Sequence, residues 1–335
     1  MKTFRTDTYG GIDSLILQHA EPPGALAAGQ VRVGMRAASL NYRDLMALAG
    51  QLRGPKEGLI ALSDGAGEVL EVAPDVTHIA VGDRVALTFN TGWLGGPWRP
   101  DPTCLTTRCC PLQGVMQEQM VVQHSELVLL PEQLSFAEGA CLPCAGVTAW
   151  HALCGERPLL PGMVVLLQGA GGVATLGLQL AKLFGARVIM ISSSDERCQR
   201  LRALGADETI NYKTVPEWQA AVRDLTGGRG VDLAIDLGGA ETIDRSIAAT
   251  AMGGRLAPVG LVTGWPNTVS SIFTASVDIT PVRVGSRDDF QNLLRAMAFH
   301  GVQPVIDRHF SFEQLPEALR YLESGKHFGK IVIDF

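Results

Sequence analysis

A strand, a glycine-rich turn and a helix follow one another at residues 164–183, and this succession constrains the fold more than any other feature. The apolar run Val164–Leu167 leads through Gln168 into the turn Gly169–Ala174, after which leucines recur at helical spacing. A turn of this kind brings backbone N–H groups and a helix N-terminus up to a diphosphate. The chain is therefore predicted to contain a nucleotide-binding α/β unit.

The turn fits the pattern G-x-G-x-x-G/A, with alanine at the third position. In this pattern Gly169 permits the tight turn, Gly171 lets the diphosphate come close, and Ala174 allows the helix to pack closely on the strand. A glycine-rich turn that binds nothing is the alternative. We predict that the backbone of the turn binds a dinucleotide, at Gly169, Ala170, Gly171, Gly172 and Val173.

Three serines follow the next strand, at the place where an acidic residue would bind the ribose 2′-hydroxyl of NAD. Hydroxyl groups can donate hydrogen bonds to a 2′-phosphate, and a nearby arginine such as Arg197 pairs with it. We therefore predict NADPH as the cofactor, with NADH less favoured, and assign Ser192, Ser193, Ser194 and Arg197 to its site. Two alternatives stay open, because Ser193-x-x-Glu196 is also a capping box and Asp195 could reach the ribose.

Strands and helices alternate from residue 164 to residue 298, which predicts a parallel, doubly wound sheet with its ligand at the C-terminal strand ends. The expected strands are 164–168, 187–191, 208–211, 231–237, 255–261 and 279–284, and the expected helices are 174–184, 194–204, 216–225, 240–249 and 288–298. The first ~125 residues are instead rich in strand-like alternation. A helical pattern lies at 41–49, a long loop at 90–114, a helix at 313–322 and a closing strand at 329–333.

Composition excludes several classes of protein. The 335 residues suffice for two domains, and with 46% hydrophobic and 19% charged residues the chain is neither disordered nor fibrous. The net charge of −6 and the lack of a long basic run argue against a nucleic-acid partner. A polar N-terminus, no membrane-spanning run and seven irregularly spaced cysteines predict a cytoplasmic protein with thiols rather than disulfides.

Short motifs recur in a specific order along nearly the whole chain: Leu40–Asp44, Ser63–Val69, Val81–Val85, Leu142–Trp150, the glycine-rich turn, Gly205–Asp207, Gly230–Asp232 and Gly329-Lys330. Together they resemble the medium-chain dehydrogenase/reductase superfamily, in particular its zinc-free quinone-oxidoreductase-like branch. The resemblance implies an α/β protein in which a doubly wound Rossmann domain is inserted between two parts of a GroES-like, β-rich catalytic domain. We place these parts at 1–127, 128–280 and 281–335, with the active site in the cleft between the domains, and expect a homodimer.

The residues at the metal-ligand positions that the resemblance implies are poor ligands for zinc. Zinc enzymes of the family carry ligands at the positions of Asn41, Ser63 and Cys144, and amide and hydroxyl groups are poor substitutes for imidazole and thiolate. Their structural zinc uses four cysteines in a lobe that matches the loop at 90–114, where Cys104, Cys109 and Cys110 have the wrong spacing. We therefore predict no zinc.

Without a metal, hydrogen-bond donors must stabilise the negative charge that hydride transfer creates on oxygen. The resemblance places Asn41 beside the nicotinamide, where its amide would donate to a carbonyl with help from Tyr42 or Arg43, and Asp44 would orient the turn. Asn41 is equally a good helix N-cap, and Tyr42 is also suited to simple packing. We predict Asn41, Tyr42 and Asp44 as the catalytic residues.

Further residues are expected near the cofactor: Thr148, Tyr212, Gly260, Gly285, Ser286 and Lys330. Each has a structural alternative, such as a back-bonding helix threonine or a glycine that serves a turn alone. Trp93 and Trp98 could close over a substrate or simply pack locally.

The combined prediction is an NADPH-dependent, zinc-free oxidoreductase that transfers hydride to an electron-poor, small-molecule acceptor such as a quinone or an α,β-unsaturated carbonyl. Two alternatives remain: a zinc-independent alcohol dehydrogenase or carbonyl reductase, and a nucleotide-binding protein without activity. No nucleic-acid or membrane partner is expected.

Overall fold

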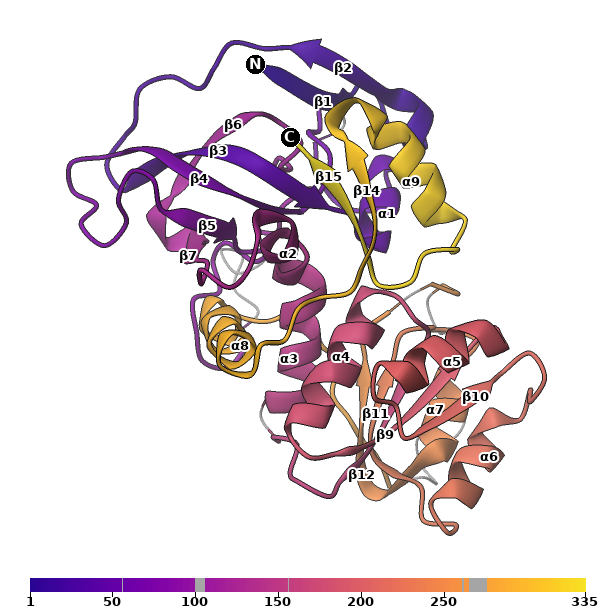
Figure 1. Ribbon diagram of the computed structural model, residues 1–335. Helices are drawn as coiled ribbons and strands as arrows, with labels where there is room; N and C mark the ends of the chain where they lie inside the picture. The colour runs from indigo at the N-terminus through magenta and orange to yellow at the C-terminus, as the bar shows by residue number, and fades with distance from the viewer. Residues whose placement is uncertain (56, 100–105, 156, 261, 265–275) are drawn as a thin grey trace. The chain divides into compact units, whose positions relative to one another are not determined.

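The computed structural model describes residues 1–335 except 56, 100–105, 156, 261 and 265–275, and it contains two compact units, whose elements are labelled in Figure 1. Unit 1 comprises Met1–Val147 and Val284–Phe335, and unit 2 comprises Thr148–Arg283. Our expected boundaries lay at 127/128 and 280/281. The first boundary differs because the segment after residue 128 contains helix α2 (Phe136–Ala140), which packs against four strands of unit 1.

Unit 2 contains a six-stranded parallel sheet of order β10-β9-β8-β11-β12-β13. Its strands are β8 (Val164–Gln168), β9 (Arg187–Ser192), β10 (Glu208–Asn211), β11 (Val231–Asp236), β12 (Thr250–Pro258) and β13 (Asp278–Ile279). The strand order reverses between β8 and β11, and in a doubly wound sheet the ligand lies outside the carboxyl ends of the strands at this point. The prediction of a Rossmann-type sheet is confirmed.

Helices cover both faces of this sheet. They are α3 (Val147–Cys154), which begins one residue before unit 2, α4 (Gly172–Leu183), α5 (Asp195–Ala203), α6 (Trp218–Leu225) and α7 (Ile243–Ala249). Trp218 and Ile247 of α6 and α7 share a buried apolar cluster with Leu166 of β8. On the other face a Cβ at Gly177 of α4 would lie 3.0 Å from Leu167. Because successive strand residues point to opposite faces, Gly177 is the residue that permits close helix–strand packing there.

The last strand of this sheet is shorter than we predicted. We expected a strand at 279–284, whereas β13 ends at Ile279. Pro281 has no N–H to donate to a ladder, and Val284 has a φ of +65°, outside the extended region. The backbone still follows β12 for a short distance, since Thr280 N and Val282 N donate to Leu256 O and Pro258 O at 2.9 Å.

Unit 1 contains a seven-stranded sheet of order β14-β15-β3-β4-β5-β7, in which β6 also pairs with β3, and a separate hairpin of β1 and β2. The strands are β1 (Lys2–Thr6), β2 (Leu15–His19), β3 (Gln30–Ser39), β4 (Asp64–Val72), β5 (Arg84–Leu87), β6 (Gln119–Gln123), β7 (Leu127–Leu129), β14 (Ile306–Ser311) and β15 (Lys330–Asp334). The C-terminal strand β15 lies between β14 and β3 and so joins the two ends of the chain in one sheet.

Three further α-helices belong to unit 1: α1 (Tyr42–Leu48), α8 (Arg287–His300) and α9 (Leu315–Glu323). Short 3₁₀ turns lie at η1 (Gly11–Ser14), η3 (His124–Glu126) and η5 (Phe312–Gln314), and η4 (Leu142–Gly146) is a turn of π-helix. The apolar face of α9, including Leu315 and Leu319, completes a core with Val31, Val33 and Ile333 of the sheet. None of the helices in the described part of the chain is long and apolar enough to cross a bilayer.

Candidate active site

The glycine-rich turn leaves β8 and enters α4 as the sequence predicts. Gly169 has a φ of +79°, a conformation that favours glycine, and its N–H donates to Ile191 O at 2.7 Å, which ties the turn to the end of β9. Gly171 is the N-cap of α4, which begins at Gly172. No side chain among the described residues caps this helix. The first N–H groups of α4 are therefore left for an anion, as a diphosphate site requires.

The serines after β9 have three different environments. Ser194 is the N-cap of α5 and accepts a hydrogen bond from Arg197 N at 3.3 Å, so a serine of this stretch does cap the helix, one residue later than in the expected capping box of Ser193 and Glu196. Ser193 Oγ lies 3.0 Å from the guanidinium of Arg197. Ser192 is 1% exposed, and its hydroxyl has no hydrogen-bond partner in the described part of the chain.

The acidic neighbour of these serines is engaged elsewhere. Asp195 accepts a hydrogen bond from Asn211 Nδ2 at 2.9 Å, at the end of β10. Tyr212 follows this strand, is 39% exposed, and donates its N–H to Ser192 O at 3.0 Å. After β9 the Ser193 hydroxyl and the Arg197 guanidinium thus form a pair, while the Asp195 carboxylate is bound by the Asn211 amide.

A buried polar network fixes the ends of β8 and β11 next to the turn. Gln168 donates to Asp236 at 3.0 Å and to Ser246 at 2.7 Å, and its oxygen accepts from Leu237 N and Gly238 N at 3.2 Å. Gln168 and Asp236 were not among our predicted site residues. A polar residue that ends a run of buried apolar strand residues is the sequence signal that would have identified Gln168.

Three of the expected cofactor residues have structural partners of their own. A Cβ at Gly260 would lie 2.0 Å from Leu237 O, so the close backbone approach that this glycine permits is to β11. Gly285 O accepts from Asn90 Nδ2 at 3.0 Å, and Ser286 caps α8 by accepting from Asp289 N at 3.1 Å. Their assignment to the cofactor site remains a prediction, as does that of Thr148, which is 2% exposed on α3.

In the described part of the 90–114 loop, Trp93 is 3% exposed and donates its indole N–H to Gly96 O at 3.0 Å, so it packs locally and is no exposed lid. Trp98 is half-buried. Cys104 lies outside the described residues.

Unit 1 contains a buried polar cluster at the N-terminus of α1, where β4 and β15 both begin. The Asn41 amide donates to Ser63 Oγ at 3.2 Å, and Ser63 donates to Asp44 Oδ1 at 2.9 Å. The other oxygen of Asp44 accepts from Asn41 N at 2.8 Å. Asn41, Ser63 and Asp44 therefore form a closed ring of hydrogen bonds, with exposures of 9%, 0% and 0%.

Lys330, which we expect near the cofactor, is bonded within this cluster. Its ammonium donates to Asn41 Oδ1 at 2.6 Å and to Leu40 O at 2.7 Å, and the residue is 3% exposed. A buried lysine at these distances is a fixed positive charge beside the Asn41 amide.

Asp64 is the second carboxyl group at this place. Its Oδ2 accepts from Cys144 N at 3.0 Å, whereas its Oδ1 is buried without a hydrogen-bond partner among the described residues. Burial raises the pKa of Asp64 to about 6, although the nearby Lys330 charge and the Asn41 amide lower it. Burial also raises the pKa of Asp44, against the attraction of Arg43, and raises that of the Cys144 thiol.

Tyr42 and Arg43, the two other residues of this turn, have different surroundings. Tyr42 is 44% exposed, and its hydroxyl makes no hydrogen bond to another described residue. Arg43 donates to Arg108 O at 2.9 Å and to Cys110 O at 3.3 Å, and its guanidinium lies 4.8 Å from the centre of the Phe89 ring. Arg43 therefore anchors the loop at 108–110 to α1, and its guanidinium also lies 3.8 Å from Asp44 Oδ1.

The residues at the implied catalytic zinc positions do not fit a zinc ion. Asn41 and Ser63 offer neutral oxygen atoms that already accept hydrogen bonds, and the Cys144 thiol, with its raised pKa, resists forming the thiolate that binds zinc. The Lys330 ammonium, 2.6 Å from Asn41 Oδ1, would also repel a divalent cation. No group of three or more histidine, cysteine, aspartate or glutamate residues in the described part of the chain could hold a metal.

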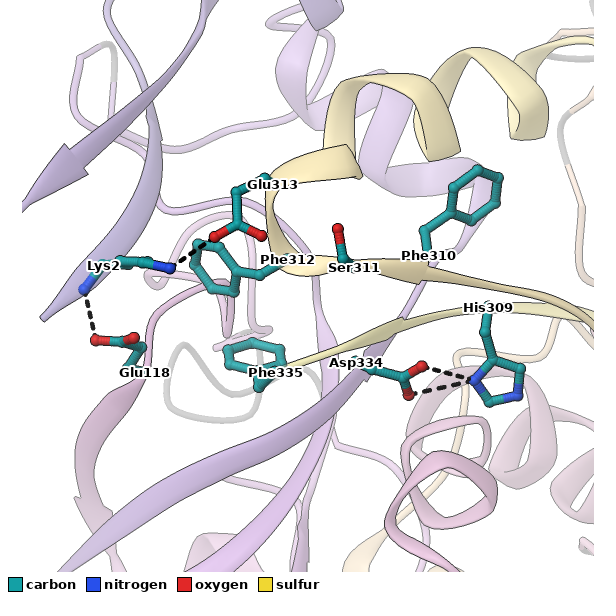
Figure 2. A pocket seen from close by; sticks show the side chains of 9 residues that line it. All are labelled: Lys2, Glu118, His309, Phe310, Ser311, Phe312, Glu313, Asp334 and Phe335. Atoms are coloured by element: carbon teal, nitrogen blue, oxygen red, sulfur yellow. Dashed lines mark hydrogen bonds and ion pairs between the residues drawn. The ribbon is translucent and has the colours of Figure 1, made fainter.

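A separate hollow of about 420 Å³ lies on unit 1 between Lys2, Glu118 and the segments 309–313 and 334–335. Figure 2 shows that its charged side chains point toward one another: Lys2 pairs with Glu313 at 2.6 Å, and His309 with Asp334 at 3.0 Å. It shares no residue with the cluster around Asn41 or with the predicted site residues. We therefore do not assign it to the active site.

Two family profiles match the chain. Residues 27–132 match the alcohol dehydrogenase GroES-like domain, and residues 172–298 match the zinc-binding dehydrogenase family. A zinc-type alcohol dehydrogenase-like protein of Schizosaccharomyces pombe is 38% identical over 98% of this chain and 97% of its own.

Three solved structures resemble this fold over its whole length. A protein described as an NAD-dependent alcohol dehydrogenase has a TM-score of 0.90 at 32% identity, and both chains are covered completely. The quinone oxidoreductase of Pseudomonas syringae pv. tomato has a TM-score of 0.85 at 27% identity, with 99% of its chain covered. A mycobacterial protein in complex with NADPH has a TM-score of 0.85 at 26% identity, with full coverage of both chains.

Proposed function

Because this chain belongs to the medium-chain dehydrogenase/reductase superfamily and is an oxidoreductase, we propose that it reduces quinones or α,β-unsaturated carbonyl compounds with NADPH and without zinc. The observation that carries the proposal is the bond between Lys330 and Asn41: a fixed ammonium and an amide donor meet at a residue whose position, by the family resemblance, matches a zinc ligand. Quinones and enones spread the charge that they gain, and so they need less electrophilic help than a simple carbonyl.

Residues of unit 2 would hold the cofactor. The unpaired N–H groups at the start of α4 suit its diphosphate, and the buried Ser192 hydroxyl and the Ser193–Arg197 pair suit the ribose with its 2′-phosphate. The engagement of Asp195 with Asn211 removes the carboxylate that would favour NAD at this place. These contacts support NADPH over NADH, and bound NADPH supplies the hydride.

Replacing Arg197 with alanine is expected to raise the KM for NADPH about 10- to 30-fold, since the loss of one charge-assisted hydrogen bond costs about 1.5–2 kcal/mol. The KM for NADH should change little, because NADH has no 2′-phosphate. Initial rates with both cofactors measure the effect. Arg202→Ala, on the same helix and bonded to Thr209 O, is the control. Equal increases for both cofactors would contradict the assignment.

In unit 1, Asn41 would stabilise the oxygen of the acceptor. Its amide is held with the oxygen toward Lys330 and one N–H toward Ser63. The other N–H, which lies near the Asp64 carboxyl, would donate to a carbonyl in which negative charge develops. The nearby ammonium favours the same charge. Asp44 accepts hydrogen bonds from Asn41 and Ser63, lies 3.8 Å from the Arg43 guanidinium, and would act as a positioning residue.

Turnover with three acceptor classes tests the proposed function. Purified protein with NADPH should reduce enones or quinones faster than simple aldehydes, and prior treatment with a strong chelator should leave the rates unchanged. Loss of activity on chelation would contradict the zinc-independent mechanism. We also propose a homodimer, which light scattering tests directly.

Interconversion of an alcohol and a carbonyl compound, without zinc, is the second candidate. The names of the alcohol dehydrogenase relatives favour it. Faster turnover of aldehydes than of enones in the same assay, again insensitive to chelation, would support this candidate over the first.

A further inference from the structure

The hydrogen bonds around Asn41 run in one direction, because the groups at their two ends have fixed roles. Lys330 is an ammonium with donors only, and its Nζ lies 2.6 Å from Asn41 Oδ1. At the other end the Asp44 carboxylate accepts from the Ser63 hydroxyl at 2.9 Å and from Asn41 N at 2.8 Å. Ser63 has therefore used its proton, and its oxygen can only accept from Asn41 Nδ2 at 3.2 Å.

This direction determines which way the Asn41 amide faces. If the amide were rotated by half a turn, its NH₂ would meet the ammonium of Lys330 and its oxygen would meet the oxygen of Ser63. Both contacts would lose a hydrogen bond in a buried place, where unpaired polar groups are costly. One N–H of Asn41 remains after Ser63 is satisfied. It lies near the Asp64 carboxyl, and its interaction with that group lowers the pKa of Asp64.

Resting on the proposed function, we infer that Lys330 is a positioning residue: its ammonium locks the Asn41 amide with the NH₂ group as donor toward the acceptor oxygen. Lys330 thus acts on the reaction through Asn41 and not through the cofactor. The two residues are 289 positions apart in sequence, and β15 brings them together by pairing with β3, whose chain continues into Asn41.

Lys330→Met tests this inference, because methionine keeps most of the side-chain length and loses the charge. The variant should lower kcat for the acceptor about 10- to 30-fold, as expected when a reacting group is misplaced, with an unchanged Kd for NADPH. Lys330→Arg should keep more activity than Lys330→Met. Lys326→Met removes an exposed lysine four residues away and serves as the matched control. A raised Kd for NADPH with normal kcat would show that Lys330 contacts the cofactor, and would overturn the inference.

A double-mutant cycle separates positioning from a general structural role. In an Asn41→Asp background, which has already lost the donor, Lys330→Met should lower kcat less than twofold further. If the two substitutions multiply, Lys330 acts independently of Asn41 and the inference fails. The cycle is run with whichever acceptor the wild-type protein turns over best.

An NMR measurement that needs no substrate tests the role of Lys330 separately from the proposed function. With selective ¹⁵N-asparagine labelling, the Asn41 side-chain NH₂ signals are identified by their loss in Asn41→Asp. They should shift and exchange faster with water in Lys330→Met, but not in Lys326→Met. Unchanged signals would contradict the inference, even if the wild-type protein reduced enones as proposed. A wild-type protein that reduced none of the acceptors would contradict only the proposed function.

Discussion

Replacing Asn41 with aspartate should lower kcat/KM for an enone or quinone about 10²- to 10³-fold, because removal of one donor to a developing oxyanion costs about 2.7–4 kcal/mol. Aspartate has the same shape and is an equally good N-cap for α1, and its carboxylate still accepts from Lys330. What it lacks is an N–H. The substitution therefore separates the donor role of Asn41 from its role at the start of the helix, which was the alternative interpretation of this residue.

Steady-state kinetics, a fluorescence titration with NADPH and a thermal unfolding curve measure the three relevant properties of this variant. We expect kcat/KM to fall while the NADPH Kd stays close to the wild-type value; the unfolding temperature should fall as well, because aspartate cannot donate to Ser63. Activity within threefold of wild type would show that Asn41 only caps α1. Tyr42→Phe is the informative companion, since Tyr42 is exposed and its hydroxyl makes no hydrogen bond to a described residue; it should lower kcat/KM by less than Asn41→Asp does.

The nucleotide-binding half of the fold could be predicted because its signals are local. Each strand and helix of unit 2 shows its own periodicity, and β8, its turn and α4 are continuous in sequence. The same holds for the serines after β9, whose capping role and proximity to Arg197 depend on neighbours within four residues. Pro281 was a local signal as well, and giving it more weight would have shortened the last strand to the observed β13.

The arrangement around Asn41 could not be predicted in the same way. Asn41 and Asp44 lie close together in sequence, but Ser63 and Lys330 reach them through β4 and β15, whose positions depend on sheet pairing. Nothing near Lys330 in the sequence indicates a buried ammonium. Asp64 follows Ser63, which we had considered only as a poor zinc ligand. The role of Asp64 becomes visible only through its burial and the hydrogen bond that it accepts from Cys144 N. The boundary near residue 147 likewise depends on the packing of α2.

Replacing Asp64 with asparagine should remove about 2 kcal/mol of pH dependence from the free energy of unfolding between pH 4.5 and pH 7, out of about 3 kcal/mol over the whole titration. In the folded protein burial raises the pKa of Asp64 from 3.8 to about 6, so between these values the folded state holds a proton that the unfolded state has lost. Stability from this group is therefore full below pH 4 and decreases as the pH rises through 6. The difference in pKa corresponds to about 3 kcal/mol.

Urea unfolding of both proteins at pH 4.5 and pH 7.0 measures this effect, because groups that titrate equally in the two proteins cancel in the difference. The amide oxygen of asparagine still accepts from Cys144 N, so the variant keeps the hydrogen bond and loses only the charge. The variant should gain stability relative to wild type as the pH rises, whereas Asp13→Asn, at an exposed site, should show a constant difference. A constant difference for Asp64→Asn as well would mean that the folded protein does not raise this pKa. The carboxyl would then be ionised throughout this range, and the negative charge beside Lys330 and Asn41 would be permanent.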